Sequence, residues 1–128
     1  MENTESQVYI RFANKQDLPD VYGLIKELAE YENAPHEPTV TLEDFIEDGS
    51  GSKPSYRVIV AIKDEEIIGI ALYYLGYSTW KGNMMYLDDL VVKNDFRRLG
   101  IGKLLFQALV AAAREHGVNQ LRWHVLSW

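Results

Sequence analysis

The sequence Arg97-Arg-Leu-Gly-Ile-Gly-Lys103 lies between an apolar segment with strand character, Met84–Val92, and a long segment rich in Leu and Ala, Leu99–His116. Glycines at the start of a helix let the backbone approach a ligand closely. The free N–H groups of the first helical turn then point at one place, where the helix dipole adds partial positive charge. Two arginines and a lysine bring three formal positive charges to the same place. The stretch therefore predicts a pyrophosphate site between a strand and a helix.

This glycine turn differs from both common nucleotide-binding signatures. It is not G-x-G-x-x-G, and it lacks the Gly-Lys-Ser/Thr of a P-loop. A glycine turn with solvated arginines is the structural alternative. A nucleotide- or phosphate-binding regulatory domain is a functional alternative, and the turn alone leaves all of these open.

Outward from the turn, the apolar periodicity predicts a mixed α/β (α+β) sheet flanked by helices. Strands are predicted at Val8–Ala13, Tyr56–Ile62, Ile67–Tyr77, Met84–Val92 and Gln120–Leu126. Helices are predicted from Asp17, acting as the cap, to Ala29, from a capping arrangement at Thr41 to Gly49, and over Leu99–His116. A right-handed crossover joins the last two strands, which are then parallel.

Length and composition exclude several classes of protein. The chain has 128 residues, which suits a single domain. No apolar run approaches the ~20 residues of a membrane span, and the N-terminus shows no signal-peptide pattern. The sequence contains no cysteine, which excludes disulfides and thiolate nucleophiles and suits a cytoplasmic protein. The three histidines show no metal-ligand spacing, so no metal site is expected.

The charge is uneven along the chain. The formal net charge is −6, and residues 1–64 carry 13 acidic and 6 basic side chains, against 6 and 7 in residues 65–128. Nucleic acid is not an expected partner, because phosphate backbones require a basic face. An acidic first half attracts cations over a long range, although soluble domains are often acidic without such a role.

Several motifs together resemble one family. Arg97–Gly102 (R-R-L-G-I-G) resembles the R-x-x-G-x-G/A acetyl-CoA motif of the GCN5-related N-acetyltransferases (GNAT), and the preceding strand, Tyr86–Val92, fits it too. Leu24–Glu32 (LIKELAEYE), Tyr77–Gly82 (YSTWKG) and the sequence Tyr-Leu-Asp-Asp from Tyr86 are similar to the diamine branch, which includes spermidine/spermine and thialysine acetyltransferases. The resemblance extends from about Val8 to Trp128. It implies the GNAT fold, with a mixed, mostly antiparallel central sheet.

The resemblance also implies how acetyl-CoA binds. In the family, the strand before the motif separates from its neighbour, and its free backbone groups pair with the pantetheine arm. The amides of the glycine turn hold the pyrophosphate. The implied acetyl-CoA contacts are Leu90, Val91, Val92, Arg97, Arg98, Leu99, Gly100, Ile101, Gly102 and Lys103.

The adjacent acids Asp88 and Asp89 are candidates for function, since an acid in an apolar strand is costly unless it is paired. Alternation along a strand predicts that they face opposite sides, so that only one enters a given cleft. The resemblance implies that Asp88 helps to remove the amine proton through water, where the family commonly has Glu. Asp89 is then expected to be structural.

The remaining substrate contacts are implied by the resemblance alone. They are Tyr31, Glu32, Trp80, Asp88, Arg122, Trp123 and His124. Other interpretations remain open for three of them: Glu32 as a solvated acid, Trp80 as a loop anchor, and His124 as a structural histidine.

The sequence differs from the family's pattern at two places that bear on its expected activity. Ser78 stands where the polyamine enzymes have an acid, which favours a smaller amine. The family continues past the position of Trp128 with a helix, whose tyrosine protonates the departing thiolate, and with further strands. This C-terminal part is expected to be missing, so residues 1–128 form a single N-acetyltransferase domain without it.

The sequence thus predicts an acetyl-CoA-dependent N-acetyltransferase. Its expected acceptor is the primary amine of a small diamine, polyamine or thialysine-like amino acid. The alternative is an acetyl-CoA-binding module or inactive fragment without turnover. A homodimer is expected, because the family resemblance implies one and because a shortened sheet exposes an edge.

Overall fold

The structure is a computed structural model, which describes residues 7–34 and 36–123 of the chain. The strands are β1 (Tyr9–Phe12), β2 (Arg57–Lys63), β3 (Glu66–Ser78), β4 (Gly82–Val92) and β5 (Leu121–Trp123). The α-helices are α1 (Leu18–Tyr31), α2 (Leu42–Asp48) and α3 (Ile101–Glu115), and the 3-10 helices are η1 (Lys15–Asp17) and η2 (Asn94–Leu99).

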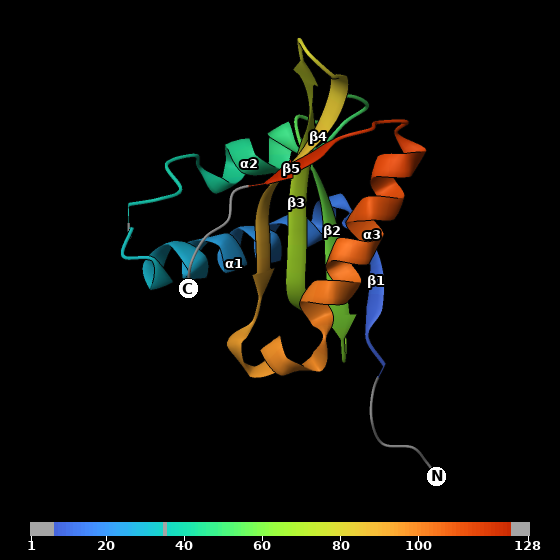
Figure 1. Cartoon of the computed structure of the whole chain (residues 1–128). Coiled ribbons are helices and arrows are strands. Elements are labelled where there is room, and N and C mark those ends of the chain that lie inside the picture. Colours follow the sequence, from blue (N-terminus) through green and yellow to red (C-terminus); the bar gives the residue numbers. More distant parts are fainter. Residues whose placement is uncertain (1–6, 35, 124–128) are drawn as a thin grey trace.

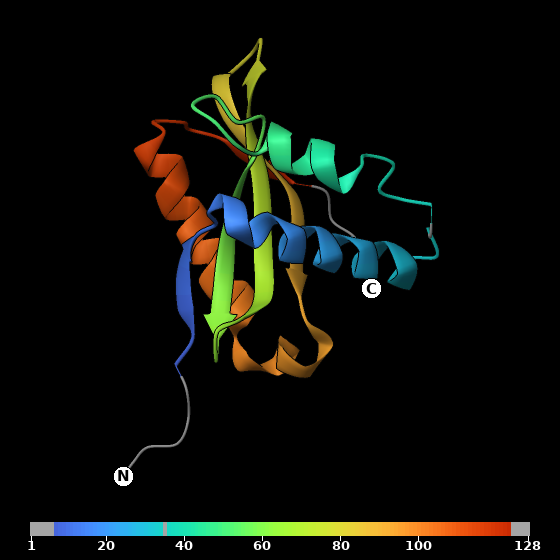
Figure 2. The ribbon, with the colours of Figure 1, turned by 180° about the vertical axis from the view of Figure 1, so that it is seen from behind.

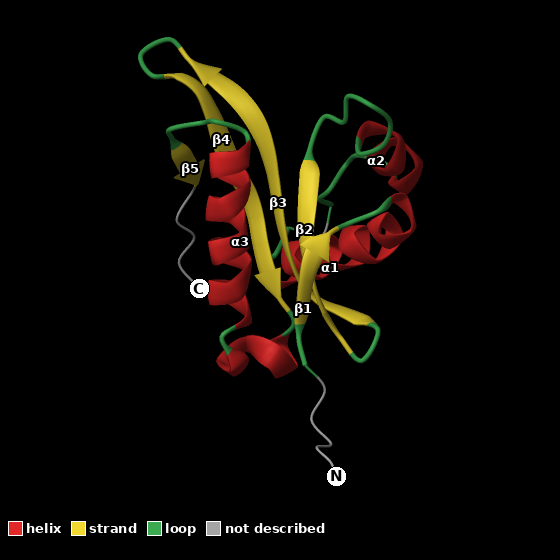
Figure 3. Cartoon of the chain, turned by 90° about the vertical axis from the view of Figure 1, so that its right-hand side faces the viewer, coloured by secondary structure: helices red, strands yellow, loops and turns green. Residues whose placement is uncertain are grey.

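The strands form one sheet in the order β1-β2-β3-β4-β5. The pairs β1–β2, β2–β3 and β3–β4 are antiparallel. The pair β4–β5 is parallel, as the predicted crossover requires. Helices α1 and α2 cover one face of this sheet, and α3 covers the other (Figures 1 and 3). The predicted α+β fold, with a mixed and mostly antiparallel sheet, is therefore confirmed.

Each face of the sheet has its own apolar core. Beneath α3, buried residues of β2, β3 and β4 pack against Ile101, Leu105 and Leu109. Beneath α1 and α2, other residues of the same strands pack against Leu18, Val21, Leu24 and Phe45. Side chains alternate between the two cores along the strands, as expected for a sheet that is covered on both faces. Figure 2 shows α1 crossing the strands on its own face.

Two helix starts differ from the sequence prediction. The Asp17 side chain does not cap α1. Instead it accepts hydrogen bonds from Asn14 N (2.8 Å) and from Arg11 Nη1 (2.6 Å), which ties η1 to β1. The third helix is predicted from Leu99, which is the last residue of η2, and α3 begins two residues later, at Ile101. Thr41 Oγ1 does accept from Asp44 N (3.1 Å), so the predicted cap of α2 is confirmed.

The hairpin of β3 and β4 extends beyond the rest of the sheet (Figure 3). Ser78 Oγ accepts from the N–H groups of Trp80 and Lys81 at its tip, both at 3.2 Å. Trp80 itself is 92% exposed. None of the helices in the described ranges combines the length and the apolar character that crossing a membrane requires.

Candidate active site

A β-bulge brings the two adjacent acids of β4 to the same face of the sheet. Leu72 of β3 pairs with Asp89, and the next residue, Tyr73, pairs with Leu87, so Asp88 is the extra residue. A bulge interrupts the alternation of side chains along its strand. Asp88 and Asp89 consequently line one cavity on the side of α1 and α2. The expectation that they face opposite sides is wrong.

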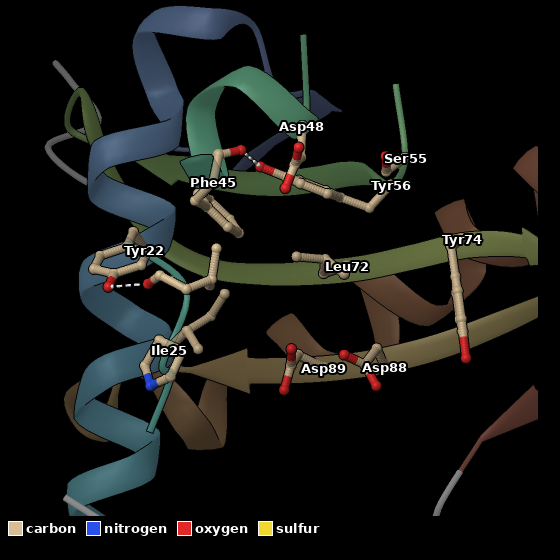
Figure 4. Close-up of a pocket in the computed structure, with 12 residues that line it drawn as sticks. Tyr22, Ile25, Phe45, Asp48, Ser55, Tyr56, Leu72, Tyr74, Asp88 and Asp89 are labelled. Atoms are coloured by element: carbon tan, nitrogen blue, oxygen red, sulfur yellow. Dashed lines mark hydrogen bonds between the residues drawn. The ribbon is translucent and has the colours of Figure 1, made fainter. Parts of the chain in front are cut away.

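The cavity, named here the amine cavity after the acceptor that the sequence predicts, has a volume of about 430 Å³ (Figure 4). Its floor is Leu72 at the centre of the sheet. It is lined by Tyr22, Ile25, Pro38, Val40, Phe45, Asp48, Ser55, Tyr56, Leu72, Tyr74, Asp88 and Asp89. These residues come from α1, α2, β3, β4 and the loops that connect them.

Aromatic packing fixes one wall of the amine cavity. The ring of Phe45 stacks on Tyr56, with 4.8 Å between centroids, and lies tilted against Tyr22 at 5.4 Å. Tyr56 Oη donates to Phe45 O (2.6 Å), and Tyr22 Oη donates to Val40 O (2.7 Å). Both hydroxyls are therefore used to hold α1, α2 and β2 together. Burial, and then the charge of Asp48, raise the pKa of Tyr56, so its hydroxyl stays neutral.

The acids of the cavity have different environments. Asp88 is exposed, whereas Asp89 is half-buried. Burial raises the pKa of Asp89 to about 6, and the nearby charges of Asp88 and Glu32 act in the same direction. Burial and then Asp88 also raise the pKa of Tyr74. The cavity is thus a place where negative charge accumulates and a cation is favoured.

The half of β4 that follows the bulge has a strand on one side only. β5 pairs with just three residues of β4, Met85–Leu87, whereas β3 pairs with β4 along its whole length. In residues 7–34 and 36–123, the second edge of β4 is therefore open from Asp88 to Val92. An open edge presents N–H and C=O groups that can pair with an extended ligand.

Two of the three predicted pantetheine contacts direct their backbone groups to this open edge. Lys93 N donates to Ile68 O (2.8 Å) across the β3–β4 pair. Bonded and non-bonded positions alternate in an antiparallel pair. The backbone groups of Val91 therefore face β3, whereas those of Leu90 and Val92 face the open edge.

The glycine turn has the features that the pyrophosphate prediction requires. Gly100 has a φ of 75°, a left-handed conformation that favours glycine. A Cβ added at Gly100 or Gly102 would meet no described atom within 4 Å. No described side chain caps the first turn of α3, and no acidic residue lies in that turn. Free amides, open space and an uncompensated helix dipole together fit a bound pyrophosphate.

The side chains of the turn contribute differently. Arg98, Leu99 and Lys103 are exposed, so both cationic side chains can reach a ligand over the turn. The Ile101 side chain is fully buried in the core beneath α3. Of the groups of Ile101, only the backbone N–H can therefore contact a ligand.

Arg97 holds the end of β4 to α1. Its Nε donates to Val92 O (3.1 Å), and its guanidinium lies 5.7 Å from the centre of the Tyr31 ring. Both side chains line a second cavity of about 310 Å³ between α1 and the end of β4. Tyr31, predicted as a substrate contact, thus lines this second cavity and not the amine cavity.

Asp88 lines the amine cavity, whereas Glu32, Trp80, Arg122 and Trp123 are not among its lining residues. Trp80 is at the exposed hairpin tip. Trp123 packs edge to face on Phe106 of α3, with 5.5 Å between centroids. Arg122 donates from Nε to the side-chain oxygen of Gln120 (2.9 Å), with the amide oriented to accept it. His124 lies outside the described residues.

Sequence reasoning missed five polar residues of the cavity, which are Tyr22, Asp48, Ser55, Tyr56 and Tyr74. Their elements are far apart in the sequence, so no local motif joins them. Only the position of Asp48 could have indicated a function from the sequence. It is a carboxylate just before the glycine that ends a helix, where the helix dipole disfavours negative charge.

Comparisons with known proteins identify the family of this chain. The sequence profile of the acetyltransferase (GNAT) family matches residues 18–128. Thialysine N-ε-acetyltransferase from Bos taurus is 37% identical over 129 residues, which cover 94% of this chain and 76% of that protein. Spermidine/spermine N(1)-acetyltransferase-like protein 1 from Homo sapiens is 32% identical over 126 residues, which cover 93% of this chain and 18% of that protein.

Solved structures show the same fold. An aminoglycoside acetyltransferase from an uncultured soil metagenomic sample has a TM-score of 0.77 at 21% identity, covering 94% of this chain and 78% of that one. An integron cassette protein from the mobile metagenome of V. cholerae has a TM-score of 0.73 at 26% identity, covering 94% and 76%. The resemblance seen in the sequence is confirmed: this chain belongs to the acetyltransferase (GNAT) family.

Proposed function

We propose that this N-acetyltransferase takes the acetyl group from acetyl-CoA and transfers it to the primary amine of a small cationic acceptor. The acceptor class is a diamine, a polyamine or a thialysine-like amino acid. One observation carries the proposal: an acid-lined cavity ends at the bulge of β4, where the strand edge becomes open and leads to the uncapped start of α3. The names of the relatives support the acceptor class.

For acetyl-CoA, the fitting residues are those of the open edge and the glycine turn. The backbone groups of Leu90 and the N–H of Val92, whose carbonyl oxygen already accepts from Arg97, would pair with the pantetheine arm. The first-turn amides of α3 would hold the pyrophosphate. Arg98 and Lys103 would add charge to that site. When bound, acetyl-CoA supplies an activated acetyl thioester.

For the amine, the two acids of β4 have the central role. An alkyl ammonium titrates near the lysine value of about 10.4, so it arrives charged and must lose a proton. The carboxylates of Asp88 and Asp89 attract the cation into the cavity. Asp88, at the exposed end of the pair, then accepts its proton through water. Holding the amine beside the open edge supplies the proximity that the transfer needs.

The test is release of free CoA from acetyl-CoA in the presence of a panel of amines. Turnover that requires a primary amine is expected. Binding of acetyl-CoA in calorimetry without turnover with any amine would instead favour a binding module. Tighter binding of ATP than of acetyl-CoA would favour a nucleotide-binding domain.

We further propose that residues 1–128 act as a single N-acetyltransferase domain and that it forms a homodimer. In the described part of the chain, β5 is the last strand of the sheet, and a second copy would cover its outer edge. A clean monomer in sedimentation at micromolar concentration would contradict the dimer. The cytoplasmic location stays a prediction from the cysteine-free sequence.

A further inference from the structure

The amine cavity carries its acids in two separate places. Asp88 and Asp89 lie on β4, whereas Asp48 lies at the end of α2, on the side of β2 (Figure 4). Leu72 of β3 forms the apolar floor between them, and it pairs with Val58 of β2 on one side and Asp89 on the other. The strands β2 and β4 are two strand spacings apart, or about 10 Å. The cavity therefore has two negative ends and an apolar middle.

The backbone of Asp48 is held in place, whereas its carboxylate has no charged partner among residues 7–34 and 36–123. Ser55 N donates to the carbonyl oxygen of Asp48 (2.7 Å), which fixes the end of α2 beside the start of β2. Within the described ranges, no side chain donates a hydrogen bond or forms an ion pair to its carboxylate. No basic residue lies in the last turn of α2. Asp48 is exposed to solvent, and its carboxylate interacts unfavourably with the helix dipole, which a cation bound to it would relieve.

The described lining of the cavity offers a cation carboxylates at both ends, but it offers a carboxylate no cationic side chain. Its described lining holds three aspartates and three tyrosines but no Lys, Arg or His. A substrate with a second ammonium group could place it at Asp48 while its reacting amine lies at Asp88 and Asp89. A free amino acid would bring its α-carboxylate into the same negative surroundings, which repel it.

We infer that Asp48 binds the distal ammonium group of the acceptor, so that the cavity selects short alkyl diamines over amino acids with a free carboxylate. This inference rests on the proposed acetyl transfer and decides among its acceptors. It separates this chain from the activity in the name of its thialysine relatives, because thialysine carries an α-carboxylate.

The experiment compares three amines of the same length in the acetylation reaction. Cadaverine has two ammonium groups, pentylamine has one, and L-lysine is cadaverine with an added α-carboxylate; thialysine is assayed beside them. We expect kcat/KM for cadaverine to exceed that for pentylamine and for both amino acids by about 10-fold or more, as for loss of one charge-assisted contact. Asp48→Asn should lower kcat/KM for cadaverine about 10-fold more than it lowers kcat/KM for pentylamine. Glu47→Gln, which removes a neighbouring charge of α2 outside the cavity, is the matched control and should change neither value.

The outcomes separate this inference from the proposed function. If lysine or thialysine is acetylated as well as cadaverine, or if Asp48→Asn lowers kcat/KM for cadaverine and pentylamine equally, the inference is overturned while acetyl transfer stands. If no amine supports release of CoA, acetyl transfer itself fails. Calorimetric titration of the protein with cadaverine and with lysine then still tests the inference. Equal affinity for the two amines would contradict selection by Asp48. Equal affinity of the wild type and the Asp48→Asn variant for cadaverine would contradict it as well.

Discussion

Replacing Asp89 by Asn should stabilise the protein at neutral pH. Burial, aided by the charges of Asp88 and Glu32, raises the pKa of Asp89 from 3.8 to about 6. That difference corresponds to about 3 kcal/mol of unfavourable free energy for the ionised carboxylate, as an upper value. The amide of the Asp89→Asn variant would have nearly the same shape but no charge, and we expect a gain of about 1–3 kcal/mol in the free energy of unfolding at about pH 7.5.

The effect of Asp89→Asn on the free energy of unfolding should depend on pH. The unfolded chain loses the proton of Asp89 near the ordinary pKa, while the folded protein keeps it up to about pH 6. The folded state therefore binds more protons between these values, and the stability that the group contributes is lost as the pH rises through about 6. The advantage of Asp89→Asn should be largest above about pH 6 and should vanish near about pH 4.

Urea unfolding at about pH 7.5 and about pH 4 measures this difference directly. Asp20→Asn is the control, because Asp20 is an exposed acid of α1 outside the amine cavity, and the same pH trend is not expected for it. A loss of stability for Asp89→Asn at the higher pH, or a gain that is equal at both pH values, would show that Asp89 is not a destabilised carboxylate.

Three further substitutions test the site. Gly102→Val should weaken acetyl-CoA binding in calorimetry by well over 10-fold, because its side chain would fill the open space over the turn. Gly23→Val, at an equally open glycine of α1, should not weaken it, and equal affinity of both variants would contradict the pyrophosphate site. Gly69→Ala should lower the free energy of unfolding by about 1–3 kcal/mol in urea unfolding. Its Cβ would lie 3.2 Å from the carbonyl oxygen of Val91 and from two side chains of α3. An unchanged free energy of unfolding would mean that α3 shifts freely. Asp88→Asn should lower kcat/KM by about 10²–10⁴-fold at pH 7 and by less at high pH, where free amine is abundant, and a loss that is independent of pH would remove its role in proton transfer.

The sequence predicts the order of the strands and the glycine turn because each depends on local patterns. Apolar alternation reports a strand whatever its neighbours are, and Gly100 is recognisable because its left-handed backbone favours glycine. The observed boundaries of the helices and strands differ from the predicted ones by only a few residues, and the predicted end of the last strand at Leu126 lies outside the described residues. The start of α3 differs by two residues, because Gly100 in its left-handed conformation separates the 3-10 helix Asn94–Leu99 from the α-helix that begins at Ile101.

The cavity could not be predicted in the same way, because it depends on how strands pair. Leu72 and Tyr73 of β3 determine that Asp88 is the extra residue of β4, and nothing in the sequence of β4 alone records this pairing. Likewise, the stacking of Phe45 on Tyr56 joins α2 to the start of β2 only after folding.

The bulge connects the shape of the sheet to the chemistry of the cavity. Without it, the alternation of a regular strand would send Asp88 or Asp89 into the core beneath α3, where an unpaired acid is costly. With it, both acids face the amine cavity, and the exposed Asp88 adds its charge to the environment that keeps the pKa of Asp89 at about 6. An incoming ammonium group meets both carboxylates together and should lower the pKa of Asp89, since opposite charge favours the ionised form. Binding of a diamine should therefore release protons below about pH 6, and calorimetry of cadaverine binding in buffers of different ionisation enthalpy would detect this release. A binding enthalpy that is independent of the buffer at about pH 5.5 would show that the pair and the cation do not interact.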